Sequence, residues 1–81
     1  MDQALKDIAR NAREHEHKYP TLRILLGEVA ELAYALDGEH EHRPDYELVQ
    51  IGGLVVNWLR RIYKHRKLGG DVRPLVGKEG P

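Results

Sequence analysis

The sequence predicts an all-α fold, in which each chain contributes three helices to an oligomeric helical bundle. Apolar residues recur at intervals of three and four positions in three segments of the 81-residue chain. Proline and glycine, which interrupt helices, lie between these segments. A chain this short leaves much apolar surface uncovered when it folds alone, so we expect it to associate with copies of itself as a dimer or tetramer.

The first predicted helix covers Asp2 to about Glu16, with Asp2 as its candidate N-cap. It is weakly apolar, and its spaced apolar positions are Leu5, Ile8, Ala9 and Ala12. Pro20 ends the segment, because proline disfavours the helical conformation in the residue before it and fits the first turn of a following helix.

The second predicted helix begins near Pro20 or Thr21 and ends before Gly38, a residue type that favours helix C-termini. Its apolar side chains form one stripe: Leu22, Leu25, Leu26, Val29, Leu32, Ala33 and Leu36. Such a stripe is typical of a helix that packs one face against a neighbour.

The third predicted helix begins at Pro44 and runs to about His65. Its apolar positions are so many that little polar face remains: Leu48, Val49, Ile51, Leu54, Val55, Val56, Trp58, Leu59, Ile62 and Tyr63. Gly52 and Gly53 in its middle cost up to about 1 kcal/mol each relative to alanine, which is tolerated where another backbone approaches closely. We therefore expect this helix to lie at a subunit interface.

Residues 1–67 are predicted to form a single helical domain, and residues 68–81 a tail rich in glycine and proline. The tail is expected to be either flexible or draped over a neighbour. The chain has no cysteine, which excludes disulfides and thiolate zinc sites and favours the reducing cytoplasm. No apolar run approaches the length of a membrane span, so we expect no membrane partner.

The net charge is zero, but it is unevenly distributed. Acidic residues predominate in residues 1–47 and basic residues in 48–81, with net charges of −5 and +5. A nucleic-acid-binding domain normally carries a clear positive charge, so a nucleic-acid partner is not expected. Another copy of the chain is the more natural partner.

Polar side chains follow one face of the second and third predicted helices. Glu28 and Glu31 lie three residues apart, beside apolar neighbours. Spacings of three and four also align a set in the third helix: Glu47, Gln50, Leu54, Asn57 and Arg61. If the two faces meet, their side-chain oxygens suit a hard divalent cation such as Mg²⁺. The alternative is that the three acids are ordinary surface residues, paired with Arg23, Arg60 or Lys64.

The ExxE motif at Glu28–Glu31 is followed after fifteen residues by an ExxQ motif at Glu47–Gln50, and then by Asn57. This order resembles the ExxE, ExxD and Asn pattern of the MazG-like all-α nucleoside triphosphate pyrophosphohydrolases, over about residues 15–65. The chain departs from that pattern at Gln50, where the family has an aspartate. A neutral amide oxygen still binds a hard cation, but the site loses one negative charge.

The resemblance implies hydrolysis of a nucleoside triphosphate to a monophosphate and pyrophosphate with Mg²⁺ or Mn²⁺, in the cleaning of nucleotide pools or in signalling. Glu28, Glu31 and Glu47 would bind the metal, and one of them would orient or deprotonate the attacking water. Gln50 would be a further metal ligand. Asn57 would contact the sugar or base of the substrate. From helix geometry, Arg61 or Lys64 would meet the phosphates, and Lys18 would do so if the first helix reaches the bundle.

Two other functions compete with hydrolysis. The glutamine in ExxQ could mean lower activity, a role for Gln50 beside the metal ligands rather than among them, or a non-catalytic relative. In the last case the chain would be a helical module that binds another protein through the apolar surface of the third helix. A compact DNA-binding domain is disfavoured, because the third helix is too apolar to serve as a solvent-facing recognition helix. The tetrapeptide Glu-His-Glu-His occurs at 14–17 and 39–42, but residues two apart do not share a helical face, so we expect solvated positions there rather than a metal site.

Overall fold

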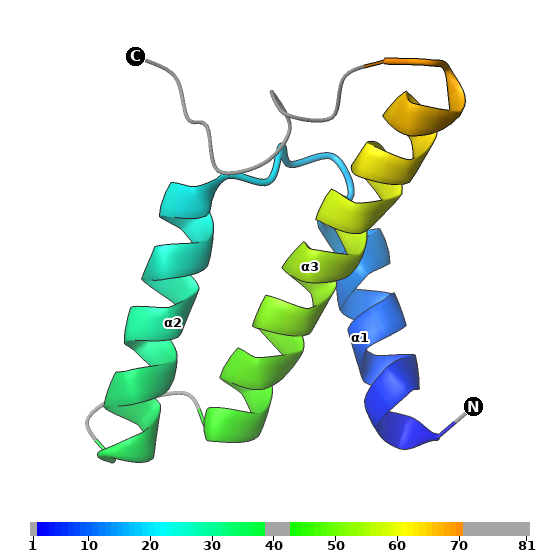
Figure 1. Cartoon of the computed structure of the whole chain (residues 1–81). Helices are drawn as coiled ribbons and strands as arrows, with labels where there is room; N and C mark the ends of the chain where they lie inside the picture. Colours follow the sequence, from blue (N-terminus) through cyan, green and yellow to red (C-terminus); the bar gives the residue numbers. More distant parts are fainter. Residues whose placement is uncertain (1, 39–42, 71–81) are drawn as a thin grey trace.

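The structure is a computed structural model that describes residues 2–38 and 43–70. These residues form three helices and no strand (Figure 1). The helices are α1 (Gln3–Glu14), α2 (Leu22–Leu36) and α3 (Pro44–Lys67). The predicted all-α fold is confirmed. The second histidine-rich tetrapeptide and the tail beyond residue 70 lie outside the described residues.

The helix ends follow the local signals in the sequence. The side chain of Asp2 accepts a hydrogen bond from the Leu5 backbone N–H at 3.0 Å, as expected of an N-cap. Thr21 caps α2 in the same way, accepting from the N–H of Ile24 at 3.2 Å. Gly38 has a φ of +76°, a conformation in which a side chain would be strained. These contacts explain why the predicted and observed boundaries agree to within about two residues.

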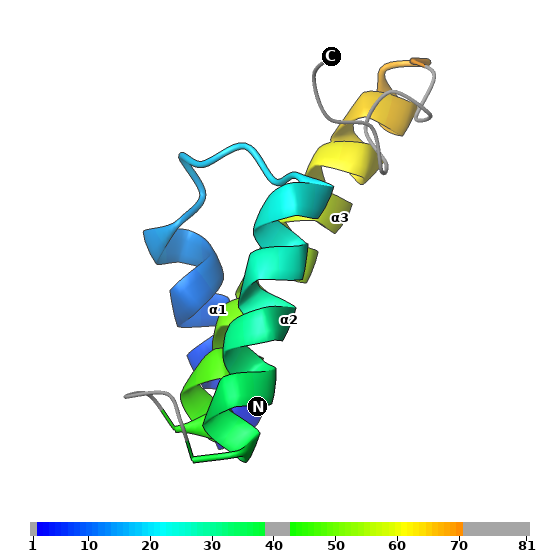
Figure 2. The ribbon, with the colours of Figure 1, turned by 90° about the vertical axis from the view of Figure 1, so that its left-hand side faces the viewer.

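The helices form a thin layer with α3 as its central element. α1 and α2 each pack on α3 but not on each other (Figure 1). The last turns of α3 extend beyond the start of α2, as both ribbon views show (Figure 2). The molecule measures 44 × 36 × 16 Å, and a helix with its side chains is about 10–12 Å across. A layer this thin cannot enclose a core.

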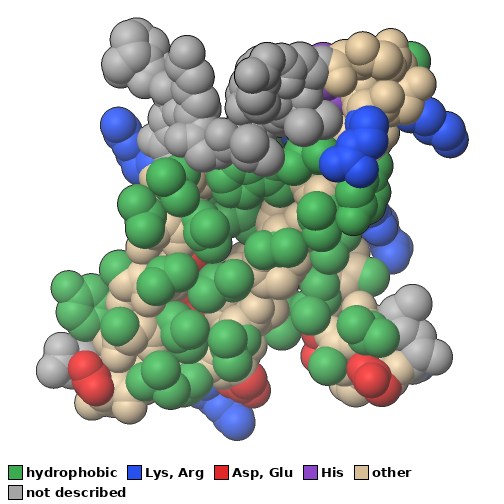
Figure 3. All heavy atoms as spheres, viewed as in Figure 1, with side chains coloured by type: hydrophobic (Ala, Val, Ile, Leu, Met, Phe, Trp, Pro, Cys, Tyr) green, Lys and Arg blue, Asp and Glu red, His purple; other side chains and the backbone are tan. Residues whose placement is uncertain are grey.

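Apolar side chains are accordingly exposed rather than buried. Leu26 is 59% exposed and Leu36 is 67% exposed, and hydrophobic side chains cover much of the face shown in Figure 3. The buried apolar side chains that the structure describes include the small Ala12 and Ala35. Among the described residues, the largest side chain that is fully buried is Glu47. The interior of the layer is therefore formed by small and polar groups.

The two glycines of α3 allow α1 to approach closely. A Cβ atom at Gly53 would lie 3.1 Å from the backbone nitrogen of Ala12 and 2.8 Å from Cγ of Asn11. A Cβ at Gly52 would lie 2.9 Å from Cγ1 of Ile8. The close approach that the sequence predicts is thus made by a helix of the same chain, so the glycine pair does not itself mark a subunit interface.

None of the helices in the described part of the chain is long and apolar enough to cross a membrane.

Candidate metal centre

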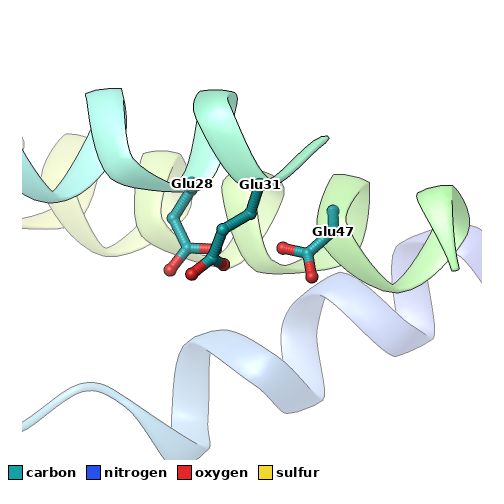
Figure 4. A group of neighbouring side chains, drawn as sticks. All are labelled: Glu28, Glu31 and Glu47. Carbon is teal, nitrogen blue, oxygen red and sulfur yellow. The ribbon is translucent and has the colours of Figure 1, made fainter. Parts of the chain in front are cut away.

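Three carboxylates from two helices meet in the middle of the layer. Glu28 and Glu31 lie one turn apart on α2 and point toward α3, where Glu47 projects from the first turn (Figure 4). One carboxylate oxygen of each residue lies within 4.8 Å of the corresponding oxygens of the other two. The structure thus brings together the three acids that the sequence singles out.

This cluster is only partly open to solvent. Glu47 is completely buried and Glu28 is half-buried, whereas Glu31 is the most accessible of the three. The Oε2 atom of Glu28 is itself buried and has no hydrogen-bond partner among the described residues. Surface acids that merely face water do not show this arrangement, since water satisfies their oxygens.

Burial raises the pKa of the Glu28 carboxyl above its usual value, and the negative charges of Glu31 and Glu47 raise it further. A hydrogen bond with Glu47 acts in the same direction on this pKa, while His15 opposes it. Proximity of like charges and loss of water both disfavour the ionised form. A cation bound between the carboxylates would reverse this effect, because it would neutralise the charge that the cluster now has to hold.

The donor set suits a hard divalent cation. Carboxylate oxygens bind Mg²⁺ at about 2.0–2.1 Å, so ligands on opposite sides of the ion are about 4.2 Å apart. The oxygens of Glu28, Glu31 and Glu47 are within 4.8 Å of one another, so a small movement of flexible side chains would place them around one ion. The three acids therefore fit Mg²⁺ or Mn²⁺ without a change in the backbone.

Gln50, the predicted fourth ligand, forms hydrogen bonds within the chain. Its Oε1 atom accepts from Nδ2 of Asn11 at 2.8 Å, and its Nε2 atom donates to the Tyr46 hydroxyl at 2.9 Å. The amide thus links α3 to α1 next to the acidic cluster. In this structure the Oε1 atom of Gln50 already accepts a hydrogen bond from Asn11.

Asn57 and Arg61, which were predicted to contact the substrate, also connect α3 to the end of α1. The buried Asn57 donates through Nδ2 to the carbonyl oxygen of Ala12 at 2.8 Å. Nη2 of Arg61 lies 3.2 Å from the Glu16 carbonyl oxygen and 3.3 Å from that of Lys18. The guanidinium of Arg61 also lies over a tyrosine ring, 4.9 Å from its centroid. These contacts hold the α1–α2 connection against α3.

A cavity of about 110 Å³ lies beside the acidic cluster, between the three helices. It is lined by Asn11, His15, Lys18, Tyr19, Ile24, Glu28, Gln50, Leu54 and Asn57. Lys18, which the resemblance places near phosphates, is exposed at this cavity. The residues that point into the region between α1, α2 and α3 are therefore mostly polar, and Glu28 joins the cavity to the carboxylate cluster.

Sequence reasoning missed Asn11 and His15 as members of this site. Asn11 lies three residues after Ile8 and His15 four residues after Asn11, so both continue the inward face of the first helix, and this periodicity is the signal that would have found them. His15 instead attracted attention as part of a tetrapeptide whose other members are exposed.

A larger open groove of about 640 Å³ runs between α1 and the start of α3. Two ion pairs lie along it, Arg10 with Asp7 at 2.5 Å and Arg43 with Asp45 at 3.4 Å. These pairs are largely exposed, and solvent-exposed pairs of this kind are common on protein surfaces. The groove lacks the concentration of buried acids that marks the carboxylate cluster.

Comparisons with protein-family models, with curated proteins and with solved structures give no significant match.

Proposed function

We propose that this chain is a Mg²⁺- or Mn²⁺-dependent nucleoside triphosphate pyrophosphohydrolase of the MazG-like type, which acts in the cytoplasm on unwanted nucleotides. The observation that carries the proposal is the meeting of Glu28, Glu31 and Glu47 within 4.8 Å, with two of the three withdrawn from solvent. The ExxE and ExxQ motifs occupy adjacent helices, as the resemblance requires.

In this proposal the three glutamates hold the cation between α2 and α3. Mg²⁺, when bound, neutralises phosphate charge and lowers the pKa of a coordinated water. Glu47 supplies the rigid, buried side of the site, whereas Glu31 lies on the side that solvent and substrate can reach. Lys18 is placed at the cavity to meet the negative charge of the phosphates.

The amides and the arginine have a supporting part in this scheme. Gln50 holds α1 beside the glutamates through Asn11, and Asn57 holds the last turn of α1 through a main-chain oxygen. Arg61 fixes the connection that carries Lys18. Each contact acts on the position of α1 relative to the metal-binding helices, so these residues shape the substrate side of the site.

The test is a pyrophosphate-release assay across canonical and damaged nucleoside triphosphates with Mg²⁺ or Mn²⁺. Wild-type protein should release pyrophosphate, and Glu28→Ala should abolish the release. Glu16→Gln is the matched control, since Glu16 is exposed and lies outside the cluster. Absence of turnover with every nucleotide, or full turnover after Glu28→Ala, would contradict the proposal.

Self-association belongs to the same proposal. The exposed apolar side chains of α2 and α3 lie on a layer that is too thin to bury them. Contiguous apolar surface of this kind is usual at protein interfaces. We expect a homodimer or homotetramer in solution, which analytical ultracentrifugation will measure directly. A monomer at all concentrations would contradict this part of the proposal.

A non-catalytic interaction module is the second candidate, and the same exposed apolar surface favours it. Tyr34, Leu36 and Leu48, all more than half exposed, would then bind a different protein. Thermal melting with added Mn²⁺ separates the two candidates. A real metal site stabilises the folded state by mass action, whereas an interaction module without one melts at the same temperature.

A further inference from the structure

The orientation of His15 is set by one hydrogen bond to the main chain. Its Nδ1 atom lies 3.0 Å from the carbonyl oxygen of Asn11, four residues earlier in α1. A carbonyl oxygen only accepts, so Nδ1 carries the hydrogen in this contact. In the neutral imidazole the second ring nitrogen, Nε2, then has a lone pair and no hydrogen.

His15 and Glu28 line the same small cavity from different helices. His15 follows the end of α1, and Glu28 lies on α2. At about 110 Å³ the cavity has room for a few waters, each of which fills about 30 Å³ in the liquid.

The other polar residues of this cavity are poor proton acceptors. Lys18 has only donors on its side chain when charged. The phenol oxygen of Tyr19 is barely basic, and the same holds for the side-chain amides that line the cavity: Asn11, Gln50 and Asn57. The carboxylate of Glu28 belongs to the metal-binding cluster, where its charge is needed for the cation. His15 is the lining residue whose second ring nitrogen has a free lone pair that can accept a proton.

We infer that His15 is the general base of the proposed hydrolysis, and that its Nε2 atom takes a proton from a water in the cavity that His15 shares with Glu28. This inference rests on the proposed function. The water's O–H bond breaks, its oxygen forms a bond to the α-phosphorus, and the bond from that phosphorus to the bridging oxygen breaks. Pyrophosphate leaves with the electron pair, and His15 afterwards releases its proton to pyrophosphate or to solvent.

The first test replaces His15 by asparagine and by alanine. We expect kcat to fall by about 10²- to 10³-fold, within the usual range for loss of a general base, with KM and metal-dependent stabilisation unchanged. His17→Ala is the matched control, because His17 is exposed two residues away and should retain the wild-type kcat. Added imidazole should restore turnover in His15→Ala, where it can occupy the vacated space.

His15 also caps the C-terminus of α1, so the folding of each variant must be measured by circular dichroism. Asparagine is common at helix C-termini and keeps a polar side chain there, which makes His15→Asn the safer variant. A second readout needs no turnover. In the metal-free wild type, long-range ¹H–¹⁵N spectra should show the Nδ1–H tautomer of His15, and an Nε2–H tautomer would overturn the inference.

The outcomes separate this inference from the function on which it rests. Wild-type release of pyrophosphate with undiminished kcat in folded His15→Asn would remove the inference and leave the proposed function standing. A loss of kcat that imidazole does not restore, together with a weaker metal-dependent shift in melting temperature, would also overturn it by assigning His15 a structural role. A wild-type protein that releases no pyrophosphate removes both.

Discussion

Replacement of Glu28 by glutamine should stabilise the metal-free protein, although most substitutions of partly buried residues destabilise. Two unit charges 4.8 Å apart interact by about 3.5 kcal/mol at an effective dielectric constant of about 20. Glu28 faces two such charges, on Glu31 and Glu47. Solvent reaches part of the cluster and screens these charges. We therefore expect Glu28→Gln to raise the free energy of unfolding by about 1–2 kcal/mol at pH 8 and low salt. For a domain of this size that corresponds to a rise of about 5–10 °C in Tm.

The gain should depend on pH in a defined direction. A carboxyl whose pKa is raised in the folded state contributes stability below its unfolded value, and this contribution is lost as the pH rises through the folded pKa. The pKa of Glu28 is raised from 4.5, so the wild type should lose stability as the pH rises above about that value. Glu28→Gln has no proton to lose there. The two proteins should therefore differ little at pH 4 and most at pH 8.

Bound metal should make the wild type more stable than Glu28→Gln, the reverse of their order without metal. A cation at 100 times its Kd stabilises a folded protein by about 2.7 kcal/mol, and the glutamine variant should lose most of this because it has one fewer anionic ligand. Melting curves by circular dichroism at pH 4 and 8, with and without Mn²⁺, give the Tm of both proteins under all four conditions. Glu16→Gln controls for removal of a negative charge outside the cluster. A lower Tm for metal-free Glu28→Gln at pH 8 than for wild type would refute the electrostatic reasoning.

Three further predictions concern the packing of the layer. Asn57→Ala should cost about 1–3 kcal/mol, because it leaves the buried carbonyl of Ala12 without its donor, and an unchanged urea midpoint would contradict this. Gly53→Ala should destabilise the fold by about 1–3 kcal/mol, since the added Cβ would meet Asn11. Gly27→Ala should instead stabilise the fold by up to about 1 kcal/mol, because no atom lies within 4 Å of its added Cβ. A gain in both variants would argue against the close approach of α1. Finally, the Tm of the wild type should rise with protein concentration, as expected for a fold coupled to self-association, and a constant Tm would count against that coupling.

Helix positions were predictable because the signals are local. Proline at 20 and 44, glycine at 38 and the capping residues Asp2 and Thr21 act within one turn of their own positions. The meeting of the acids was also accessible to sequence reasoning. Spacings of three place side chains on one face of a helix, and two faces that border apolar stripes tend to meet when those stripes pack.

The roles of the amides were not accessible in this way. Gln50 and Asn57 lie on the polar face that the periodicity predicts, but their hydrogen-bond partners depend on how far α1 is shifted along α3. That shift is determined by the fit of the first helix over Gly53, a contact between residues more than forty positions apart. Periodicity within one helix carries no information on such a shift. The partners of Arg61 could not be predicted for the same reason.

The complete burial of Glu47 in a layer with so few large apolar side chains inside links heat resistance to ligand binding. Variants selected for survival at high temperature in chelator-containing buffer should accumulate neutral replacements at this glutamate and its acidic neighbours. Selection in the presence of manganese should preserve them. If the chain binds the proposed cation, engineering for heat stability should be carried out with that cation present, since neutral replacements that stabilise the metal-free protein would remove the proposed ligands.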